Sequence, residues 1–547
     1  MKYIKIKAFK LFFLIALTVG YSFSYAQTER PKLIIGIVVD QMRMEYLYRY
    51  DPYFSNKGFK RLIKDGFLYS NMHYNYVPTH TAPGHASIYT GTTPVNHGIM
   101  GNSWYNRERK KKMYCTEDDT VSPLGTPAQE SEGKMSPKNL QSTTITDELK
   151  LSTNFRGKVF GVSMKDRGAI LPAGHFADRA YWLSDNGNFI SSTFYGKDFP
   201  AWVNTYNLEK KYMKYINEGW NLFRDKSLYK ESLSDNNSYE MMSFTADQKA
   251  VFPYNLKEAY DKQGAKVLKS TPFTSDMIVD FAKELIVRED LGKDADTDFL
   301  ALSFSATDVI SHMTSPRSME TQDTYMRLDE NIADLLSFLD AKIGKNNYLL
   351  FLTADHSGAE NPLYLNDNGY EVASIDYKEV TKKLKDFSVQ TFGKDFIETY
   401  STQNIYLNED AIASSGKNPN EIIEKLVSYV ESFPWVKRVY TEAQILSANP
   451  TDEHASMIFR GYDKTQNGQL YVLLKPAYME YMKEGTTHGA SYTYDTHVPA
   501  LFYGWKIHHG ISHKKQVITE IAPTLSQKVQ ITFPNSTSAQ VLNEILE

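Results

Sequence analysis

The chain of 547 residues carries 61 Lys and Arg against 65 Asp and Glu, which gives a formal net charge of −4. An acidic balance argues against a protein that binds the phosphate backbone of nucleic acids. The 38 Tyr and 29 Phe indicate a stably folded chain, and the single cysteine, Cys115, excludes an internal disulfide. The length favours one large elaborated domain or two domains.

The first 26 residues have the pattern of a secretory signal peptide. Four lysines precede an apolar run from Leu11 to Val19, and Ser24 and Ala26 are small residues at the −3 and −1 positions of a cleavage site. The run is well short of the roughly 20 residues that span a bilayer, which argues against an uncleaved anchor. We expect cleavage after Ala26 and a periplasmic or secreted protein without membrane attachment. Removing four lysines from 61 basic residues leaves 57 against 65 acidic ones, a charge of −8.

Three apolar runs, each followed closely by an aspartate, predict strands buried on both faces of a mostly parallel sheet. The runs are Lys32–Val39, Asp298–Ser305 and Tyr348–Thr353. The aspartates that follow them are Asp40, Asp308 and Asp355. Open α/β sheets place their sites at the carboxyl ends of the strands, so we expect these carboxylates at one edge of the sheet.

Helical periodicity alternates with these strands. It occurs in Asp276–Arg288, with Ser275 as a possible N-cap, in Thr321–Ile343, and in Val517–Val529 after a strand-like run at Ala500–Tyr503. The pattern predicts an α/β fold in which a mostly parallel central sheet carries helices on both faces.

Less regular segments interrupt this pattern at about residues 105–136, 177–271 and 360–483. The last contains its own helix (Asn420–Phe433) and strand (Leu470–Leu474). We interpret all three as insertions that roof the site within one catalytic domain of residues 27–547.

Three aspartates and three histidines have the composition of a two-metal site: Asp40, Asp308, His312, Asp355, His356 and His488. Carboxylate oxygens and imidazole nitrogens suit Zn²⁺, and three protein ligands per metal leave positions open for substrate. Taken singly, each residue has a simpler interpretation as a helix N-cap, a polar loop residue or a surface histidine. The joint pattern favours two Zn²⁺ ions per chain.

The spacing of these residues supports that interpretation. Asp308 and His312 are four residues apart, so on a helix they share one face. Asp355 and His356 are adjacent in a loop after a strand, where both side chains can converge on the metals. His497 lies close to His488 in the sequence, and we expect it to orient the metal ligands.

Thr81 stands where a nucleophile is needed, in the segment 79–85 (THTAPGH). Zinc can activate a threonine hydroxyl without a general base. Pro83-Gly84 predicts a tight turn, and a helix beginning nearby would direct its amides at a phosphate. A threonine N-cap is the structural alternative, and the two are compatible.

Three further residues are candidates for binding phosphoryl oxygens. Asn102 offers an amide donor, and Lys165 and Arg167 offer two cations on the same side of a segment predicted to be extended. A surface charge pair is the commoner meaning of Lys-x-Arg. Here the pair precedes 168–174 (GAILPAG), which would be an unusually apolar surface loop.

Together these motifs resemble the alkaline phosphatase superfamily, and most closely its phosphate-irrepressible (PafA-type) alkaline phosphatases, along almost the whole mature chain. The resemblance implies that Asp40, Thr81, Asp355 and His356 hold one zinc, and Asp308, His312 and His488 the other. It also implies that Thr81 accepts the phosphoryl group covalently while Asn102, Lys165 and Arg167 contact its nonbridging oxygens. The expected activity is hydrolysis of small phosphate monoesters by a protein expected to be a monomer.

Other functions remain open at this stage. A nucleotide pyrophosphatase or phosphodiesterase shares the metal ligands, Thr81 and Asn102, but Lys165 and Arg167 favour a monoester dianion. A sulfatase lacks support because the segment 81–85 does not contain the Cys or Ser that this group requires. A phosphonate hydrolase, a phosphoglycerate mutase and a non-catalytic zinc-binding protein are weaker alternatives.

Overall fold

A computed structural model of the protein describes residues 29–241, 244, 249–482 and 484–546. The predicted signal peptide and its cleavage site lie outside these ranges. Within them, no helix combines the length and the apolar character that a membrane crossing requires.

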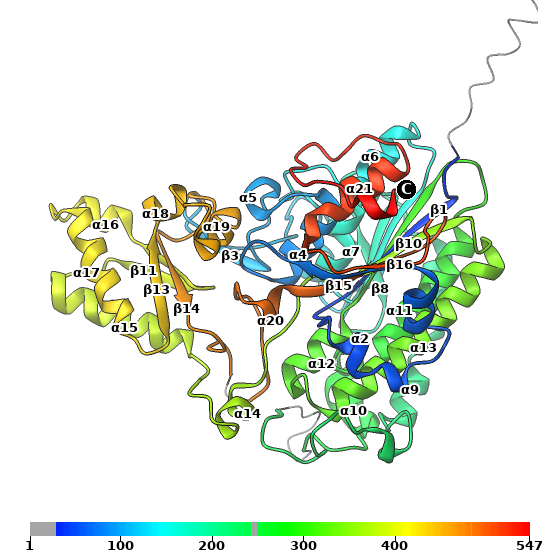
Figure 1. The fold of residues 1–547 in the computed structure, drawn as a ribbon, viewed down its shortest axis with the longest axis horizontal. Coiled ribbons are helices and arrows are strands. Elements are labelled where there is room, and N and C mark those ends of the chain that lie inside the picture. Colours follow the sequence, from blue (N-terminus) through cyan, green and yellow to red (C-terminus); the bar gives the residue numbers. More distant parts are fainter. Residues whose placement is uncertain (1–28, 242–243, 245–248, 483, 547) are drawn as a thin grey trace, which may run out of the picture.

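The described residues form an eleven-stranded central sheet (Figure 1). Ten strands lie in the order β16 (Gly510–Ser512), β2 (Phe67–His73), β15 (His497–Gly504), β10 (Tyr348–Thr353), β1 (Leu33–Val39), β9 (Asp298–Phe304), β6 (Val159–Ser163), β7 (Arg179–Leu183), β8 (Phe189–Ser192) and β5 (Pro123–Leu124), and β17 (Gln516–Val517) also pairs with β2. The strands from β10 to β7 are parallel, whereas β15, β8 and β5 run antiparallel to their neighbours.

The three predicted central strands are confirmed. β1, β9 and β10 are buried along their whole lengths, as expected for parallel strands covered on both faces. Their register pairs Val39 with Phe304 and Val38 with Thr353, so the strands end almost level. The residues that follow them therefore meet at one edge of the sheet.

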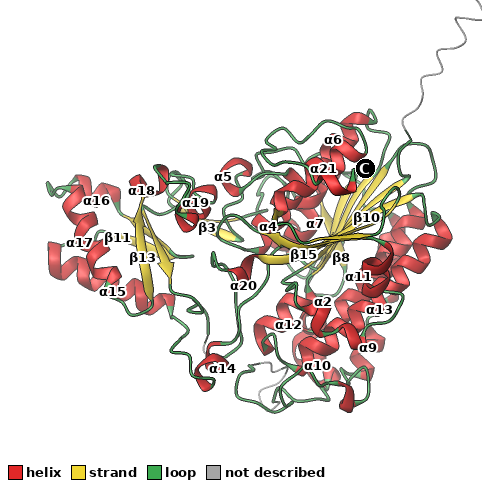
Figure 2. Ribbon diagram, viewed as in Figure 1, coloured by secondary structure: helices red, strands yellow, loops and turns green. Residues whose placement is uncertain are grey.

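Helices cover both faces of the sheet, which confirms the predicted fold class (Figure 2). One face carries α4 (Thr81–Thr90), α6 (Ile145–Ser152), α7 (Asp166–Ala173) and α21 (Ile521–Lys528). The other carries α3 (Phe59–Asp65), α11 (Phe273–Arg288), α12 (Ala306–Thr314) and the long α13 (Met319–Lys342).

Two helix predictions need correction. α11 begins at Phe273 with Pro272 as its N-cap residue, so Ser275 lies inside the helix. The predicted helix Val517–Val529 is instead the end of β17, a 3₁₀ turn at Ile518–Glu520 and then α21. Its first residue, Val517, pairs with His73 of β2 as part of the strand β17, a contact that local periodicity does not report.

Residues 360–483 contain a separate four-stranded antiparallel sheet, which lies apart from the central sheet in Figure 1. Its order is β11 (Ile397–Ser401), β12 (Asn404–Leu407), β14 (Leu470–Leu474) and β13 (Val436–Thr441). α15 (Tyr377–Phe392) and α17 (Pro419–Glu431) pack on it around a hydrophobic cluster of their own. Smaller helices complete the region: α14 (Pro362–Asp367), α16 (Glu409–Ala413), α18 (Glu442–Leu446) and α19 (Glu453–Arg460).

Residues 177–271 do not form one continuous layer. β7 and β8 belong to the central sheet, whereas α8 (Ala201–Glu209), α9 (Met213–Glu218) and α10 (Leu256–Gln263) follow outside it. Near the site, β3 (Ser103–Asn106) and β4 (Lys111–Tyr114) form a small hairpin. The short helices α2 (Tyr46–Arg49), α5 (Pro94–His97) and α20 (Thr493–Thr496) lie in connections. The proposed insertion boundaries remain a prediction.

Candidate active site

The carboxyl edge of the central sheet brings the six predicted metal ligands into two adjacent groups. The first group is Asp40, Asp355 and His356, and the second is Asp308, His312 and His488. Within each group the possible ligand atoms all lie within 4.8 Å of one another. Asp40 directly follows β1, and its amide donates to the carbonyl of Phe304 at the end of β9 over 3.0 Å, which ties the two strand ends together.

The first group is fully buried and holds unsatisfied ligand atoms. Asp40, Asp355 and His356 have no exposed surface. His356 Nε2 lies 3.5 Å from Asp40 Oδ1 and 3.7 Å from Asp355 Oδ2, and these three atoms have no hydrogen-bond partner. Buried polar atoms are nearly always satisfied. Two carboxylate oxygens and one imidazole nitrogen facing one point therefore fit a divalent metal ion.

The second group combines a helix with a distant loop. Asp308 and His312 lie on α12, as predicted, with 3.1 Å between Asp308 Oδ1 and His312 Nε2. His488 arrives from a loop, and its Nε2 lies 3.6 Å from the same Asp308 oxygen. This donor set also fits a metal ion.

Backbone carbonyls orient all three imidazoles. His312 Nδ1 donates to Thr486 over 2.7 Å, His356 Nδ1 to Ser357 over 2.9 Å, and His488 Nδ1 to Thr79 over 2.6 Å. A carbonyl can only accept, so each Nδ1 carries a proton, and in the neutral form of each ring Nε2 has the lone pair that a metal binds. Burial holds the pKa of His356 and His488 well below the usual range, which favours this neutral form.

The two groups touch each other. The rings of His356 and His488 stack with centroids 3.5 Å apart and an interplanar angle of 17°. Lys165 forms an ion pair with one carboxylate of each group: its Nζ lies 2.7 Å from Asp40 Oδ2 and 2.6 Å from Asp308 Oδ2. Burial alone would lower the pKa of Lys165, but these two carboxylates raise it above its ordinary value. Lys165 is thus a fixed positive charge between the groups.

Gln41 is a contributor that the sequence did not reveal. Its backbone amide donates to Asp355 Oδ1 and its side-chain amide to Asp308 Oδ1, both over 3.1 Å. It has a left-handed backbone, with φ of +61°, which non-glycine residues rarely adopt. This conformation directs both donors of one residue to the two groups. Burial, followed by the charge of Asp40, raises the pKa of Asp355 to about 7.

Thr81 is buried at the first position of α4, with His80 as the N-cap residue. The predicted tight turn at Pro83-Gly84 is wrong, because both residues lie in the first turn of the helix. Proline is tolerated at Pro83 because the first amides of a helix have no partner within it. Gly84 has another role: a Cβ at this position would lie 2.1 Å from the carbonyl oxygen of Asp355. Only glycine therefore allows the start of α4 to pack this closely against the first group.

His85 stabilises the contact between the start of α4 and the first group. Its Nδ1 lies 2.8 Å from the carbonyl oxygen of Thr81 and 3.3 Å from Asp355 Oδ2, and its Nε2 lies 2.9 Å from Ser303 Oγ. The side chain is completely buried. His85 therefore links the candidate nucleophile to β9 and to the first group.

Asn102 and Arg167 lie near the same helix start. Asn102 Oδ1 accepts from the amide of Ala82 over 2.8 Å, which leaves the Asn102 amino group available as a donor. Arg167 Nη1 donates to the hydroxyl of Tyr114 over 3.1 Å, while its buried Nε has no partner. A guanidinium held at one end in this way can present its remaining donors as a fork.

The segment that carries the two cations differs from its prediction. Lys165 has an extended backbone, but it is the N-cap residue of α7, and Arg167 lies inside that helix. The expected apolar loop 168–174 is the rest of α7 with its C-cap, buried against β6 and β7. Its small apolar residues are explained by this packing.

The orienting role expected of His497 falls instead to Asp495. His497 Nε2 lies 2.8 Å from the carbonyl oxygen of Ser70, and its ring stacks on His73. Asp495 Oδ2 accepts from the amides of Gly489 and Ala490 over 3.0 and 2.8 Å and so shapes the loop that carries His488. Burial raises the pKa of Asp495 to about 8. An aspartate within the short helix α20 gave no specific signal in the sequence.

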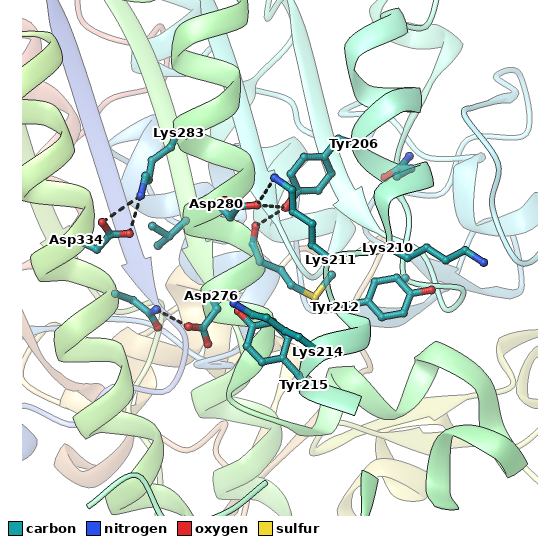
Figure 3. Close-up of a pocket in the computed structure, with 15 residues that line it drawn as sticks. Tyr206, Lys210, Lys211, Tyr212, Lys214, Tyr215, Asp276, Asp280, Lys283 and Asp334 are labelled. Atoms are coloured by element: carbon teal, nitrogen blue, oxygen red, sulfur yellow. Dashed lines mark hydrogen bonds and ion pairs between the residues drawn. The ribbon is translucent and has the colours of Figure 1, made fainter. Parts of the chain in front are cut away.

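Two of the hollows in the described surface differ in their relation to these groups. One, of about 340 Å³, is lined by His488 and His80. The other, of about 380 Å³, lies among α8, α9, α11 and α13 and shares no residue with either group (Figure 3). Several of its charged side chains pair with each other, such as Lys211 with Asp280 and Lys283 with Asp334. The first hollow is therefore the one connected to the site.

Residues 34–498 match the family described as type I phosphodiesterase / nucleotide pyrophosphatase. The chain belongs to this family. It is 39% identical over 526 residues to alkaline phosphatase PafA of Elizabethkingia meningoseptica, covering 94% of this chain and 95% of that protein. A protein named calcium-transporting ATPase from Myroides odoratus is 40% identical over 525 residues, covering 95% of both chains.

A solved structure of wild-type alkaline phosphatase PafA shares the fold, with a TM-score of 0.92 at 38% identity over 95% of this chain and 99% of that chain. These relationships confirm the resemblance to PafA-type alkaline phosphatases and make the chain an enzyme of the alkaline phosphatase group.

Proposed function

We propose that this chain is an exported, zinc-dependent phosphate monoester hydrolase that acts through a phosphothreonine at Thr81. The observation that carries the proposal is the pair of buried groups, Asp40–Asp355–His356 and Asp308–His312–His488, beside a buried threonine at a helix start. The first group holds three ligand atoms without any hydrogen-bond partner, which supports metal binding over a purely structural network.

Zinc, held by the first group with Thr81 and by the second group, would act as a Lewis acid that stabilises negative charge on the attacking and departing oxygens. The residues of the chain do the rest. Thr81 Oγ1 forms a bond to phosphorus as the ester P–O bond breaks and the alcohol departs. Water then forms a bond to phosphorus as the Thr81 O–P bond breaks, which releases inorganic phosphate and restores the hydroxyl.

Asn102, Lys165 and Arg167 have the positions and donors to hold the nonbridging oxygens during both steps. A monoester is a dianion with three such oxygens, whereas a diester has two and one negative charge. Two buried cations beside one amide donor therefore favour the monoester. The phosphodiesterase alternative, suggested by the family description, would leave these cations without an equal role.

The deciding experiment compares kcat/KM of the zinc-loaded mature enzyme on an aryl phosphate monoester and on the matching diester. We expect a strong preference for the monoester that is lost when Lys165 and Arg167 are both replaced by Ala. A preference for the diester in the wild-type enzyme would move the protein to the phosphodiesterase branch.

The covalent step has its own test. Acid-quenched wild-type enzyme should carry labelled phosphate on the peptide that contains Thr81, and Thr81→Ala should carry none. A labelled phosphoenzyme in the variant would remove Thr81 from its role. Export is tested separately by N-terminal sequencing of the protein from the periplasm or medium, which should begin at Gln27.

A further inference from the structure

Glu360 lies shortly after His356, in the connection from β10 to α14, and binds two arginines from other parts of the chain. Its Oε1 accepts from Arg43 Nη1 over 2.9 Å, and its Oε2 accepts from Arg317 Nε over 3.1 Å. The side chain of Glu360 is 15% exposed and that of Arg43 is 12% exposed. One largely buried carboxylate, with both oxygens in use, therefore connects three stretches of chain.

The two arginines come from segments that carry other metal-ligand candidates. Arg43 follows Asp40 in the connection after β1, and Arg317 follows His312 in the connection between α12 and α13. Glu360 thus ties its own segment, which holds two ligands of the first group, to the segment of Asp40 and to the helix of the second group.

Ala359 and Asn361 flank this glutamate and hold the loop of His488. The Ala359 carbonyl accepts from the Thr486 hydroxyl over 2.7 Å, and Asn361 Nδ2 donates to the Gly485 carbonyl. These two residues and the glutamate between them therefore contact or continue every segment that supplies an aspartate or histidine to the two groups.

Further contacts hold the arginines in place. Arg43 Nε donates to Glu45 Oε1 over 2.9 Å, and the same oxygen accepts from Arg49 Nη2 over 2.7 Å. Arg49 Nη1 donates in turn to the carbonyl of Pro316, directly before Arg317, over 3.0 Å. The contacts therefore form a closed network, which holds its members in one arrangement more firmly than isolated pairs would.

The chemistry of this network suits the fixing of positions better than the gain of stability. Burial alone would raise the pKa of Glu360, but the charges of Arg43 and Arg317 bring it below its ordinary value, so the carboxylate stays ionised. Buried ion pairs add little net stability compared with apolar packing, because both charges lose their hydration. Charge-assisted bonds from a planar guanidinium do fix direction and distance.

We propose that Glu360 is a positioning residue that sets the placement of the two metal groups relative to each other. The inference rests on the proposed function, because it takes both groups to bind metal. Two metal ions about 4 Å apart can stabilise the attacking and the departing oxygen together, so their separation must be held closely. Lys165 and Gln41 connect the groups through the ligands themselves, whereas Glu360 connects the segments that carry them.

Zinc titration of the metal-free protein tests the inference without relying on activity. The wild-type protein should take up two ions. Glu360→Gln keeps the size of the side chain and removes its charge, and it should weaken the binding of both ions by about tenfold, as changes around metal ligands commonly do. Weakening of one ion alone, or of neither, would overturn the inference and leave the proposed function intact. A wild-type protein that took up no zinc would overturn both.

Kinetics of the zinc-saturated enzyme on an aryl phosphate monoester give a second readout. Glu360→Gln should lower kcat about tenfold or more, since small misplacements of reacting groups are costly. A residue that served stability alone would lower the urea midpoint and leave kcat of the folded, zinc-saturated enzyme unchanged. That result would contradict the positioning role.

Arg43→Lys keeps the inference testable if Glu360→Gln does not fold. Lysine retains the charge but lacks the fork that reaches Glu360 and Glu45 together, so it should cause the same losses to a smaller extent. Arg61→Lys is the matched control: Arg61 is 14% exposed and pairs over 2.7 Å with Asp340, near the far end of α13. It should change neither zinc affinity nor kcat, and equal losses in both lysine variants would overturn the inference.

The double variant tests whether the arginine acts through the glutamate. Adding Arg43→Lys to Glu360→Gln should lower zinc affinity and kcat little further, because both substitutions remove one shared contact. Losses that simply add would show that Arg43 acts independently of Glu360 and would contradict the proposed role.

Discussion

The carboxyl edge of the central sheet and the four-stranded region at residues 360–483 are built on different principles. β1, β9 and β10 are buried on both faces, so their sequences are continuous apolar runs and their ends are fixed by parallel register. In the four-stranded antiparallel sheet only the inner strands β12 and β14 are buried along their whole lengths, whereas the outer strands β11 and β13 carry partly or fully exposed positions. The central sheet fixes the chemical groups of the site in one place. The four-stranded region supplies a surface whose residues can vary around them.

Removal of a metal ligand at the sheet edge should have the largest effect. Asp355→Ala is expected to lower kcat/KM on every substrate by about 10³-fold or more, since a Lewis acid supplies several kcal/mol and each 1.36 kcal/mol is a factor of ten. Zinc content, measured by mass spectrometry, should fall from two ions per chain to one. Retention of both ions with full activity would contradict the ligand role.

Gly84→Ala tests whether the close contact between α4 and the first group matters. The added Cβ would lie 2.1 Å from the Asp355 carbonyl oxygen, so the helix start and Thr81 must shift. A displacement of this kind is expected to cost about 10²-fold in kcat. Zinc content should stay at two ions, which distinguishes misplacement of the nucleophile from loss of metal. An unchanged kcat would show that the helix start can relax without consequence.

Asp495→Ala tests the role of the loop that carries His488 and connects the two regions. Loss of the acceptor for Gly489 and Ala490 should loosen His488 and lower zinc affinity at the second group by about 10–100-fold, while the first group keeps its ion. Titration with a chelator, followed by activity and metal content, would resolve the two sites. Equal weakening of both sites would assign Asp495 a general structural role.

In the four-stranded region, Glu480 should affect stability in a pH-dependent way. Burial raises the pKa of Glu480 to about 7, against roughly 4.3 in an unfolded chain. Between these values the folded state binds more protons, so the contribution of Glu480 to stability is present at low pH and is lost as the pH rises to 7. The free energy of unfolding of Glu480→Gln, relative to wild type, should therefore increase by about 1–3 kcal/mol between pH 5 and pH 8. Urea unfolding at both pH values measures this, and a pH-independent difference would contradict it.

Residue types and local patterns were enough to predict much of the fold and the ligand set. Three apolar runs predicted three central strands, and the i, i+4 spacing of Asp308 and His312 predicted a shared helix face, because both depend on neighbours in the chain. The predicted turn at Pro83-Gly84 and the predicted loop after Arg167 failed for a different reason. In both places the small residues serve contacts with distant segments, namely Asp355 for Gly84, and α4 and β9 for α7.

The sequence by itself determined that the chain has an α/β fold and carries carboxylates and imidazoles suited to two metals. Tertiary structure decided how they are arranged: Lys165 spans Asp40 and Asp308, Gln41 serves both groups, and Asp495 replaces His497 as the residue that shapes the loop of His488. Gln41 reaches Asp308 and Asp355 across 267 and 314 residues of chain, and no local periodicity encodes such separations. These contacts form when the sheet assembles and its parallel register brings the strand ends level.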